Sequence, residues 1–260
     1  MLMRHGEFTG LEKNYSKYRP AYSETILTAL LGMIDKDVSD INVADVGAGT
    51  GIWTRMIAKR NVKTVVAVEP NDAMREQGIK DSGGLNIKWI KGDGEKTNLD
   101  SNSCDLLTMA SSFHWVDLNQ GLKEFSRVLN DNGKFCALWN PRLIEVNPLL
   151  LEIENKLSEF SKDIKRVSSG RSGTTEKLID ELNSSPYFSD AVYMEARHIE
   201  KQTPEHYLGV WWSVNDIRVQ LGEDNFKKFM DYVEERVKDL ECIEATYLTR
   251  AFSADIKVCT

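Results

Sequence analysis

Hydrophobic residues in the first half of the chain form short apolar runs that alternate with segments of helical spacing. Five runs predict β-strands, at about 41–46, 64–69, 86–90, 104–110 and 134–139. Helices are expected after Ser23, at about 51–60 and 71–80, and after Asp117. Strands that alternate with helices predict an α/β fold with a parallel sheet and right-handed crossovers.

The regular alternation stops after about residue 140. Helical spacing continues in four segments, at about 148–165, 174–184, 204–212 and 223–240. A strand is expected at about 190–201. The run from Leu248 to Val258 alternates cleanly, which predicts an antiparallel strand. Segment 168–173, rich in serine and glycine, predicts a flexible link.

A glycine turn ends the first predicted strand. Gly47, Gly49 and Gly51 stand where side chains would keep a ligand away from the backbone. The helix that follows offers unpaired N–H groups to an anionic group. The spacing is G-x-G-x-G, whereas the dinucleotide fingerprint is G-x-G-x-x-G. The turn alone therefore does not identify the ligand.

Two carboxylates follow the next two predicted strands. Glu69 ends the second strand, and Asp93 lies just after the third. A carboxylate at the tip of the second strand can accept both hydroxyls of a ribose. Because ligands of such sheets bind at the carboxyl ends of the strands, we expect Glu69, Asp93 and the glycine turn to meet in one site.

Over about residues 40–140, these features in this order resemble the class I S-adenosylmethionine-dependent methyltransferases. The resemblance implies S-adenosylmethionine as cofactor, with Glu69 at the ribose and Asp93 and Gly94 at the adenine. It also implies a Rossmann-like seven-stranded, mostly parallel sheet in the order 3-2-1-4-5-7-6, with strand 7 antiparallel. The expected cofactor-binding residues are Tyr15, Arg19, Gly47, Ala48, Gly49, Gly51, Glu69, Pro70, Met74, Asp93, Gly94 and Ser111.

We expect a single domain over residues 1–260, in three parts. A cofactor-binding core spans 35–141, and a mostly helical cap, which includes strand 6, spans 142–242. The closing strand spans 243–260.

The N-terminal segment from Tyr15 to Tyr22 carries Arg19-Pro20 between tyrosines. Pro20 disfavours helical geometry at Arg19, which predicts an extended segment before the next helix. The segment resembles the N-terminus of small-molecule methyltransferases related to trans-aconitate methyltransferase. This resemblance implies that Tyr15 and Arg19 cover the methionine end of the cofactor. The alternative is that this segment only packs on the surface of the domain.

His114, in the segment Phe113-His114-Trp115 after the fourth strand, is the candidate catalytic residue. The segment resembles a Phe-His-Trp segment of the same small-molecule family. His114 is either a general base for the acceptor or a residue that shapes the pocket.

Aromatic residues and one arginine are expected to enclose the acceptor. Arg142 would face an anionic acceptor, and a solvent-facing arginine is the alternative. The aromatic rings are alternatively no more than the core of the cap. The substrate-binding candidates are Trp115, Trp139, Arg142, Tyr207, Trp211 and Trp212.

The composition limits the partners. A net charge of −7 argues against nucleic acid, whose binding surfaces are usually basic. No apolar run approaches the roughly 18 residues needed to span a bilayer, and no secretory signal is visible. We therefore expect a cytoplasmic monomer or homodimer without membrane or nucleic-acid partners. The four cysteines lack C-x-x-C spacing, so no metal site is expected.

The sequence thus predicts a methyltransferase that acts on a small-molecule acceptor by in-line transfer, with O-methylation favoured. One alternative is an NAD-dependent oxidoreductase, which would lack the third glycine of its fingerprint. The others are a non-catalytic cofactor-binding protein of the same fold, and a methyltransferase that acts on protein or RNA.

Overall fold

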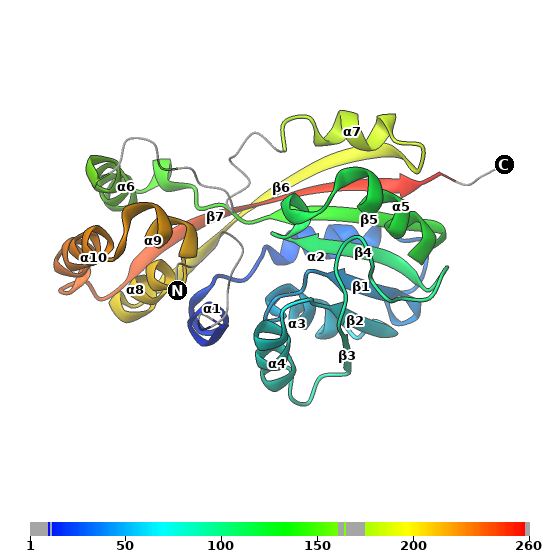
Figure 1. Ribbon diagram of the computed structural model, residues 1–260, viewed down its shortest axis with the longest axis horizontal. Coiled ribbons are helices and arrows are strands. Elements are labelled where there is room, and N and C mark those ends of the chain that lie inside the picture. Colours follow the sequence, from blue (N-terminus) through cyan, green and yellow to red (C-terminus); the bar gives the residue numbers. More distant parts are fainter. Residues whose placement is uncertain (1–9, 11, 161–163, 165–174, 258–260) are drawn as a thin grey trace.

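A central seven-stranded sheet organises the computed structural model, which describes residues 10, 12–160, 164 and 175–257 (Figure 1). The strand order is β3-β2-β1-β4-β5-β7-β6. The first five strands in this order are parallel, and β7 is antiparallel to both of its neighbours. The predicted Rossmann-like sheet is therefore confirmed. Its strands are β1 (Asn42–Val46), β2 (Thr64–Val68), β3 (Ile87–Ile90), β4 (Cys104–Ala110), β5 (Leu129–Trp139), β6 (Phe188–Gln202) and β7 (Ile243–Ile256).

Helices cover both faces of this sheet and also form a separate cap. The described helices are α1 (Glu12–Tyr18), α2 (Glu24–Gly32), α3 (Ile52–Ala58), α4 (Asp72–Asp81), α5 (Leu118–Val128), α6 (Pro148–Phe160), α7 (Leu178–Ser184), α8 (Pro204–Trp212), α9 (Asn215–Leu221) and α10 (Glu223–Val237). Three short 3₁₀ helices add η1 (Val38–Asp40), η2 (Phe113–Trp115) and η3 (Ile144–Val146).

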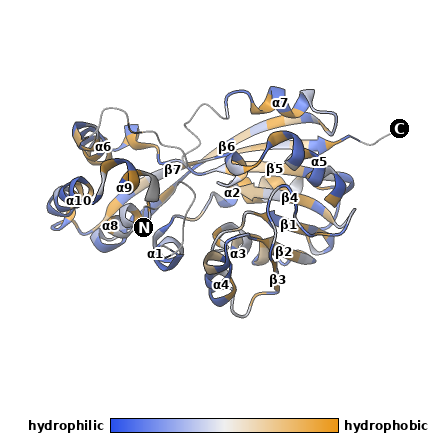
Figure 2. Cartoon of the chain, in the orientation of Figure 1, coloured by the Kyte–Doolittle hydropathy of each residue, from blue (hydrophilic) through white to orange (hydrophobic). Residues whose placement is uncertain are grey.

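The central strands are buried on both faces, which explains their continuous apolar sequences. Leu106 and Leu138 pack with the apolar faces of α2 and α3. Their neighbours Leu107 and Ala137 point to the other face and pack with residues of α5 and α7. Figure 2 shows the apolar colouring concentrated on the strands and on the inner sides of these helices. Two apolar layers thus hold the sheet between helices.

The two long strands at the end of the chain carry the cap. The second half of β7 pairs with β5, in the register Lys134↔Asp255 to Trp139↔Arg250. Its first half extends beyond β5 and pairs with β6 as far as Gln202↔Ile243. A third apolar cluster forms on this extension from α6, α8, α9, α10 and the start of β7. Figure 1 shows this helical group at one end of the β6–β7 pair.

Helix α1 lies between the sheet domain and the cap. Its Tyr18 ring meets the His206 ring of α8 edge-on, with centroids 5.5 Å apart, and His206 Nε2 contacts the Tyr18 carbonyl oxygen at 3.1 Å. On the other side, the Ser16 hydroxyl donates to Asp81 at the end of α4. This short helix therefore contacts the cap through α8 and the sheet domain through α4.

Three details differ from the sequence prediction. The extended segment predicted from Tyr15 is wrong for its first half, since α1 continues to Tyr18. Helix α9 was not predicted. Strand β5 begins at Leu129, earlier than predicted. Leu129 pairs with Cys104, and the register then shifts before Leu106 pairs with Lys134. The predicted link at 168–173 lies outside the described residues.

The α1–α8 contact predicts an unusual response to a glycine substitution. A Cβ on Gly209 would lie 2.4 Å from Cγ of Tyr18. Alanine is normally the better helix former by about 1 kcal/mol, but here we expect Gly209→Ala to destabilise the protein by about 1–3 kcal/mol because of overpacking. Urea unfolding measures the change.

Gly32→Ala is the matched control, since a Cβ at this helix end meets no atom within 4 Å. We expect Gly32→Ala to be neutral or slightly stabilising. A Gly209→Ala protein as stable as this control would show that α1 does not pack closely on α8.

Candidate functional site

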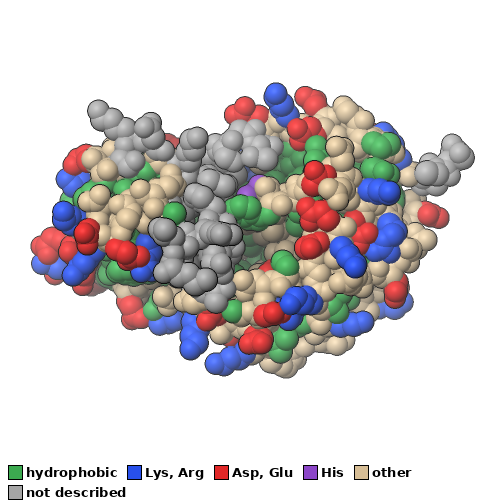
Figure 3. Space-filling model, viewed as in Figure 1, with side chains coloured by type: hydrophobic (Ala, Val, Ile, Leu, Met, Phe, Trp, Pro, Cys, Tyr) green, Lys and Arg blue, Asp and Glu red, His purple; other side chains and the backbone are tan. Residues whose placement is uncertain are grey.

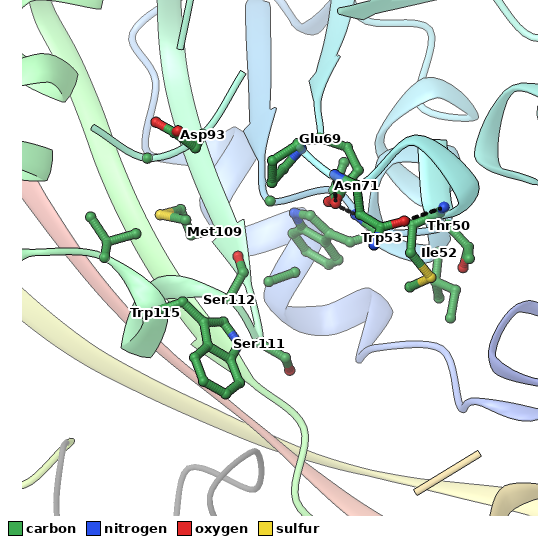
Figure 4. Close-up of a pocket in the computed structure, with 18 of the residues that line it drawn as sticks. Thr50, Ile52, Trp53, Glu69, Asn71, Asp93, Met109, Ser111, Ser112 and Trp115 are labelled. Atoms are coloured by element: carbon green, nitrogen blue, oxygen red, sulfur yellow. Dashed lines mark hydrogen bonds between the residues drawn. The ribbon is translucent and has the colours of Figure 1, made fainter. Parts of the chain in front are cut away.

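A cleft of about 440 Å³ opens at the carboxyl ends of the parallel strands. Loops after β1, β2, β3 and β4 form its walls. Figure 4 shows Glu69, Asn71 and Thr50 on one side, facing Asp93, Met109 and Ser112 across the cleft. The cleft is lined by Tyr15, Tyr22, Gly47, Ala48, Gly49, Thr50, Ile52, Trp53, Glu69, Pro70, Asn71, Met74, Asp93, Gly94, Glu95, Met109, Ala110, Ser111, Ser112, Trp115 and Val116.

The glycine turn after β1 folds tightly against the neighbouring strands. The N–H groups of Gly47 and Ala48 both donate to the Val68 carbonyl oxygen, at 2.8 and 3.0 Å. Gly47 has a φ of +68°, and a Cβ there would lie 2.6 Å from the Ser112 side chain. Only glycine satisfies both conditions. Gly51, also predicted as a site residue, has a φ of +77° and caps α3 rather than lining the cleft.

Glu69 connects two of the loops. Its Oε2 accepts from the Gly49 N–H at 2.8 Å, and its Oε1 accepts from the Asn71 N–H at 2.9 Å. The side chain is only 7% exposed. Burial raises the pKa of Glu69, and the two backbone N–H bonds oppose that rise. The carboxylate therefore has a fixed position, with its remaining lone pairs available at the cleft wall.

Asp93 sits on the opposite wall, in the loop after β3. Its Oδ1 accepts from the N–H groups of Glu95 and Lys96, at 3.1 and 2.7 Å. Gly94 follows at a tight position, where a Cβ would lie 2.4 Å from Val116. The loop therefore holds one carboxylate oxygen in place and brings the Gly94 backbone close to the cleft.

A buried acid that the sequence prediction did not single out lies at the end of β1. Asp45 is fully buried, and the hydroxyls of Thr54 and Thr108 donate to its two oxygens. Burial raises the pKa of Asp45 to about 7, although both hydrogen bonds act in the opposite direction. Its signal in the sequence was a single acid within the apolar run Val43–Val46.

Tyrosines of the N-terminal segment close one side of the cleft. The Tyr22 hydroxyl lies 2.9 Å from Ser111 Oγ, and its ring meets Trp53 edge-on at 5.3 Å between centroids. Tyr15 also lines the cleft, whereas Arg19 lies behind it, with its guanidinium 5.0 Å from the Tyr15 ring centroid. Tyr22, Trp53, Met109 and Ser112 are lining residues that the sequence prediction missed.

His114 is not among the residues that line the cleft, although Ser112 and Trp115 are. The Trp139 Nε1–H donates to His114 Nδ1 at 3.4 Å, which places the ring proton on Nε2. Burial lowers the pKa of His114 to about 4, so the ring is neutral at pH 7. Trp115 is 46% exposed and packs against the His114 ring at 4.7 Å, at the edge of the cleft.

The other aromatic candidates lie outside the cleft. Trp139 is buried in the core of the sheet domain, and Tyr207 and Trp211 are buried in the cap cluster. Trp212 is partly exposed and packs edge-on against Phe226. Arg142 is also in the cap region, with its guanidinium carbon 4.3 Å from the Trp211 ring centroid. The alternative of a solvent-facing Arg142 is therefore wrong.

Among the described residues, no group of three or more His, Cys, Asp or Glu side chains could hold a metal ion. Within the same residues, no helix has the length and apolarity required to cross a membrane.

Part of the chain is similar to known methyltransferases. Residues 44–137 match the family model described as "Methyltransferase domain". An uncharacterized methyltransferase of Mycobacterium tuberculosis is 32% identical over 128 residues, which are 49% of each protein. A protein of Dictyostelium discoideum, also named as a methyltransferase, is 30% identical over 54% of this chain and 51% of its own length. The matched region spans about half the length of these curated relatives.

A similar fold occurs in a solved structure described as a type II methyltransferase from Anaeromyxobacter dehalogenans. Its TM-score is 0.69 at 19% identity, with 92% of this chain and 98% of that chain covered. A phosphoethanolamine N-methyltransferase from Haemonchus contortus, solved with S-adenosyl-L-methionine, has a TM-score of 0.54 at 12% identity. The alignment covers 96% of this chain and 57% of that one.

The buried acid Asp45 predicts a pH-dependent stability. A carboxyl group whose pKa is raised on folding stabilises the protein fully only below its usual pKa of 3.8, and that contribution is lost as the pH rises through about 7. Asp45→Asn removes this loss. We expect the variant to gain about 2–3 kcal/mol relative to the wild type between pH 5 and pH 8.

Urea unfolding at the two pH values checks this expectation. Asp105→Asn is the control: burial raises the pKa of Asp105, but hydrogen bonds from Asn42, Lys36 and Asn130 outweigh that effect and leave it lowered. Asp105→Asn is therefore expected to show no such gain in stability between the two pH values. Equal stability differences for Asp45→Asn at both pH values would contradict the assignment of a raised pKa.

Proposed function

We propose that the protein, whose residues 44–137 match a methyltransferase domain model, transfers a methyl group from S-adenosylmethionine to a small-molecule acceptor. The main support for the proposal is the hydrogen bond from the Gly49 N–H to the Glu69 carboxylate. This bond holds the glycine turn against the tip of β2, so that both line the same cleft. The cofactor supplies an electrophilic methyl group on a sulfonium, which an acceptor displaces in line.

The cleft offers a matching group for each part of this cofactor. The fixed Glu69 carboxylate suits the two ribose hydroxyls, and Asp93 with the Gly94 N–H suits the polar edge of the adenine. Met74 and Pro70 supply apolar contact for the ring. At the other end, Gly47, Ala48 and Gly49 line the cleft with their backbone, while their N–H groups donate to Val68 and Glu69.

Two buried polar atoms in the same wall also fit a bound ligand. The Thr50 hydroxyl and the Trp53 Nε1–H are buried without a hydrogen-bond partner in the described structure. Both residues line the cleft. Buried polar groups are usually paired, so their state here is consistent with partners that a ligand or water provides.

The residues near the cleft position the reactants rather than exchange protons with them. His114 is neutral, and its Nδ1 lone pair already accepts from Trp139. Both Glu69 oxygens accept backbone N–H groups. An acceptor that carries its own negative charge needs no base, and positioning alone can supply a large part of the rate enhancement. We therefore propose O-methylation of a carboxylate as the favoured reaction.

The surface supports a small acceptor. On the face shown in Figure 3, Lys and Arg side chains are interspersed with Asp and Glu outside the grey residues. A macromolecular nucleic-acid substrate would require a continuous basic surface. We therefore propose a metabolite rather than a nucleic acid as the acceptor.

Two measurements test this proposal directly. Calorimetry should show binding of S-adenosylhomocysteine and no comparable binding of NAD. A metabolite panel, assayed by release of S-adenosylhomocysteine, should then identify an acceptor. Preferential NAD binding would favour the oxidoreductase, and cofactor binding without turnover on any acceptor would favour a non-catalytic binding protein.

Replacing Glu69 tests the ribose contact. Glu69→Gln keeps the shape of the side chain but places an NH₂ group against one of the two backbone N–H donors. We expect affinity for S-adenosylhomocysteine to fall about 10–100-fold, the usual range for hydrogen bonds to a charged group. Glu76→Gln, at an exposed position on α4, is the control and should bind normally. Unchanged binding in Glu69→Gln would remove Glu69 from the cofactor site.

Replacing His114 separates a base from a positioning residue. Because the pKa of His114 is lowered to about 4, the ring does not titrate between pH 6 and pH 9. We expect His114→Asn to keep the shape of the wild-type pH–rate profile and to lose less than about tenfold in kcat/KM. A general base would contribute about 10²–10⁴-fold. A loss of that size, or a new slope in the profile, would restore the base assignment.

A further inference from the structure

Strand β6 forms a long outer edge of the sheet. It is the last strand in the order, and among the described residues it pairs with β7 alone. It runs over 15 residues, whereas β3, at the opposite edge, has only 4. An unpaired edge presents a row of backbone N–H and C=O groups that another strand can bind, and proteins usually keep such edges short or covered. The length of β6 therefore points to a strand that binds along it.

Helix α7 protects the start of this edge. It packs on the first part of β6, as Figure 1 shows, and its Asn183 side chain accepts from the Ala191 N–H at 3.0 Å. The register with β7 also shifts between Ser189 and Val192, which disturbs the ladder there. From residue 193 to residue 201 the pairing with β7 is regular. We call this stretch the β6 edge.

The side chains on one face of the β6 edge follow a symmetric order. Tyr193, Glu195, Arg197 and Ile199 are all exposed, and they alternate with residues such as Ala196 that pack toward α2. The exposed fraction is 41% for Tyr193 and 58% for Ile199. Along the strand, this face therefore reads hydrophobic, acidic, basic, hydrophobic.

A second copy of the chain matches this order when the two strands run antiparallel. If a two-fold axis passes through Ala196, each residue faces the one that lies equally far on the other side of Ala196. Tyr193 then lies opposite Ile199 of the second copy, and Glu195 lies opposite Arg197 of the second copy. The symmetry produces each of these pairs twice. Hydrophobic pairs and opposite-charge pairs are the cross-strand contacts that stabilise antiparallel strands.

The neighbouring registers are unfavourable. The exposed residues of both copies stay on one face only if the register shifts by two residues, which moves the axis by one residue. An axis at residue 195 places Glu195 opposite its own copy, and an axis at residue 197 does the same for Arg197. Like charges that lie directly opposite each other destabilise a strand pair. The charges therefore select the register centred on Ala196.

We infer that the protein forms a homodimer through its β6 edge, with Glu195 of each copy opposite Arg197 of the other. The antiparallel pairing provides partners for the backbone groups of both edges and joins the two sheets into one. Charged residues on an edge strand can also prevent pairing, but here their signs are complementary across the two-fold axis. The inference does not depend on the proposed methyl transfer.

Sedimentation velocity of the full chain tests the inference at concentrations of about 1–100 μM, a range that covers weak and moderate association. We expect the wild type to pass from monomer to dimer within this range. Glu195→Lys and Arg197→Glu should each weaken the dimer about 10–100-fold, because each exchanges two opposite-charge pairs for two like-charge pairs.

An equimolar mixture of these two variants separates recognition from damage to the fold. In the mixed dimer, both cross-strand pairs again combine a base with an acid. The mixture should therefore dimerise about as tightly as the wild type, although neither variant does so alone. A variant that is merely misfolded would not be rescued in this way.

Lys88→Glu is the control, since it reverses an exposed charge on β3 at the opposite edge, and it should leave the dimer unchanged. Glu195 accepts from the Tyr193 hydroxyl within one chain. If Glu195→Lys does not fold for that reason, Arg197→Glu decides, because Arg197 has no ion pair among the described residues.

Three results would overturn the inference. The first is a wild type that stays monomeric over the whole concentration range, as expected if the charges only protect the edge. The second is a dimer that both charge reversals leave unchanged, since it would use another surface. The third is a mixture of the two variants that stays monomeric although both are folded.

Discussion

The carboxylate of Glu69 is the constraint on which the cleft depends. Its two oxygens accept from Gly49 and Asn71, so the glycine turn and the start of α4 are fixed relative to each other by one side chain. The N–H groups of Gly47 and Ala48 tie the start of the turn to Val68, and the buried acid holds the turn at Gly49. The carboxylate that orders the cleft is also the group that we propose contacts the ribose.

A second constraint comes from the length of β6 and β7. These strands extend past β5, and their free ends bury apolar residues against α6, α8, α9 and α10. The cap is therefore held by continuous backbone ladders rather than by a flexible linker. Helix α1 adds a contact from the other side, through Tyr18 against Gly209. The cap helices are consequently held in a defined position relative to the sheet domain.

Sequence patterns located the core of the fold and most of the cleft because their signals are local. Strand β4 was predicted with its exact bounds, and Glu69 and Asp93 follow from their positions at strand ends. The outcome for α9 is different: Val214, Ile217 and Leu221 are spaced for one helical face, but the segment is too short for the pattern to stand out. The place of Arg142 could not be predicted, since it depends on an isolated bridge to Tyr247, more than 100 residues later in the chain.

The titration behaviour of the buried groups agrees with a site that works by position. Burial raises the pKa of Asp45 and lowers that of His114, so both groups tend toward their neutral forms inside the protein. A neutral imidazole whose acceptor nitrogen is occupied is a poor base. In the proposed reaction, the charge needed for nucleophilic attack therefore comes from the acceptor, and the protein contributes by holding the two reactants in line.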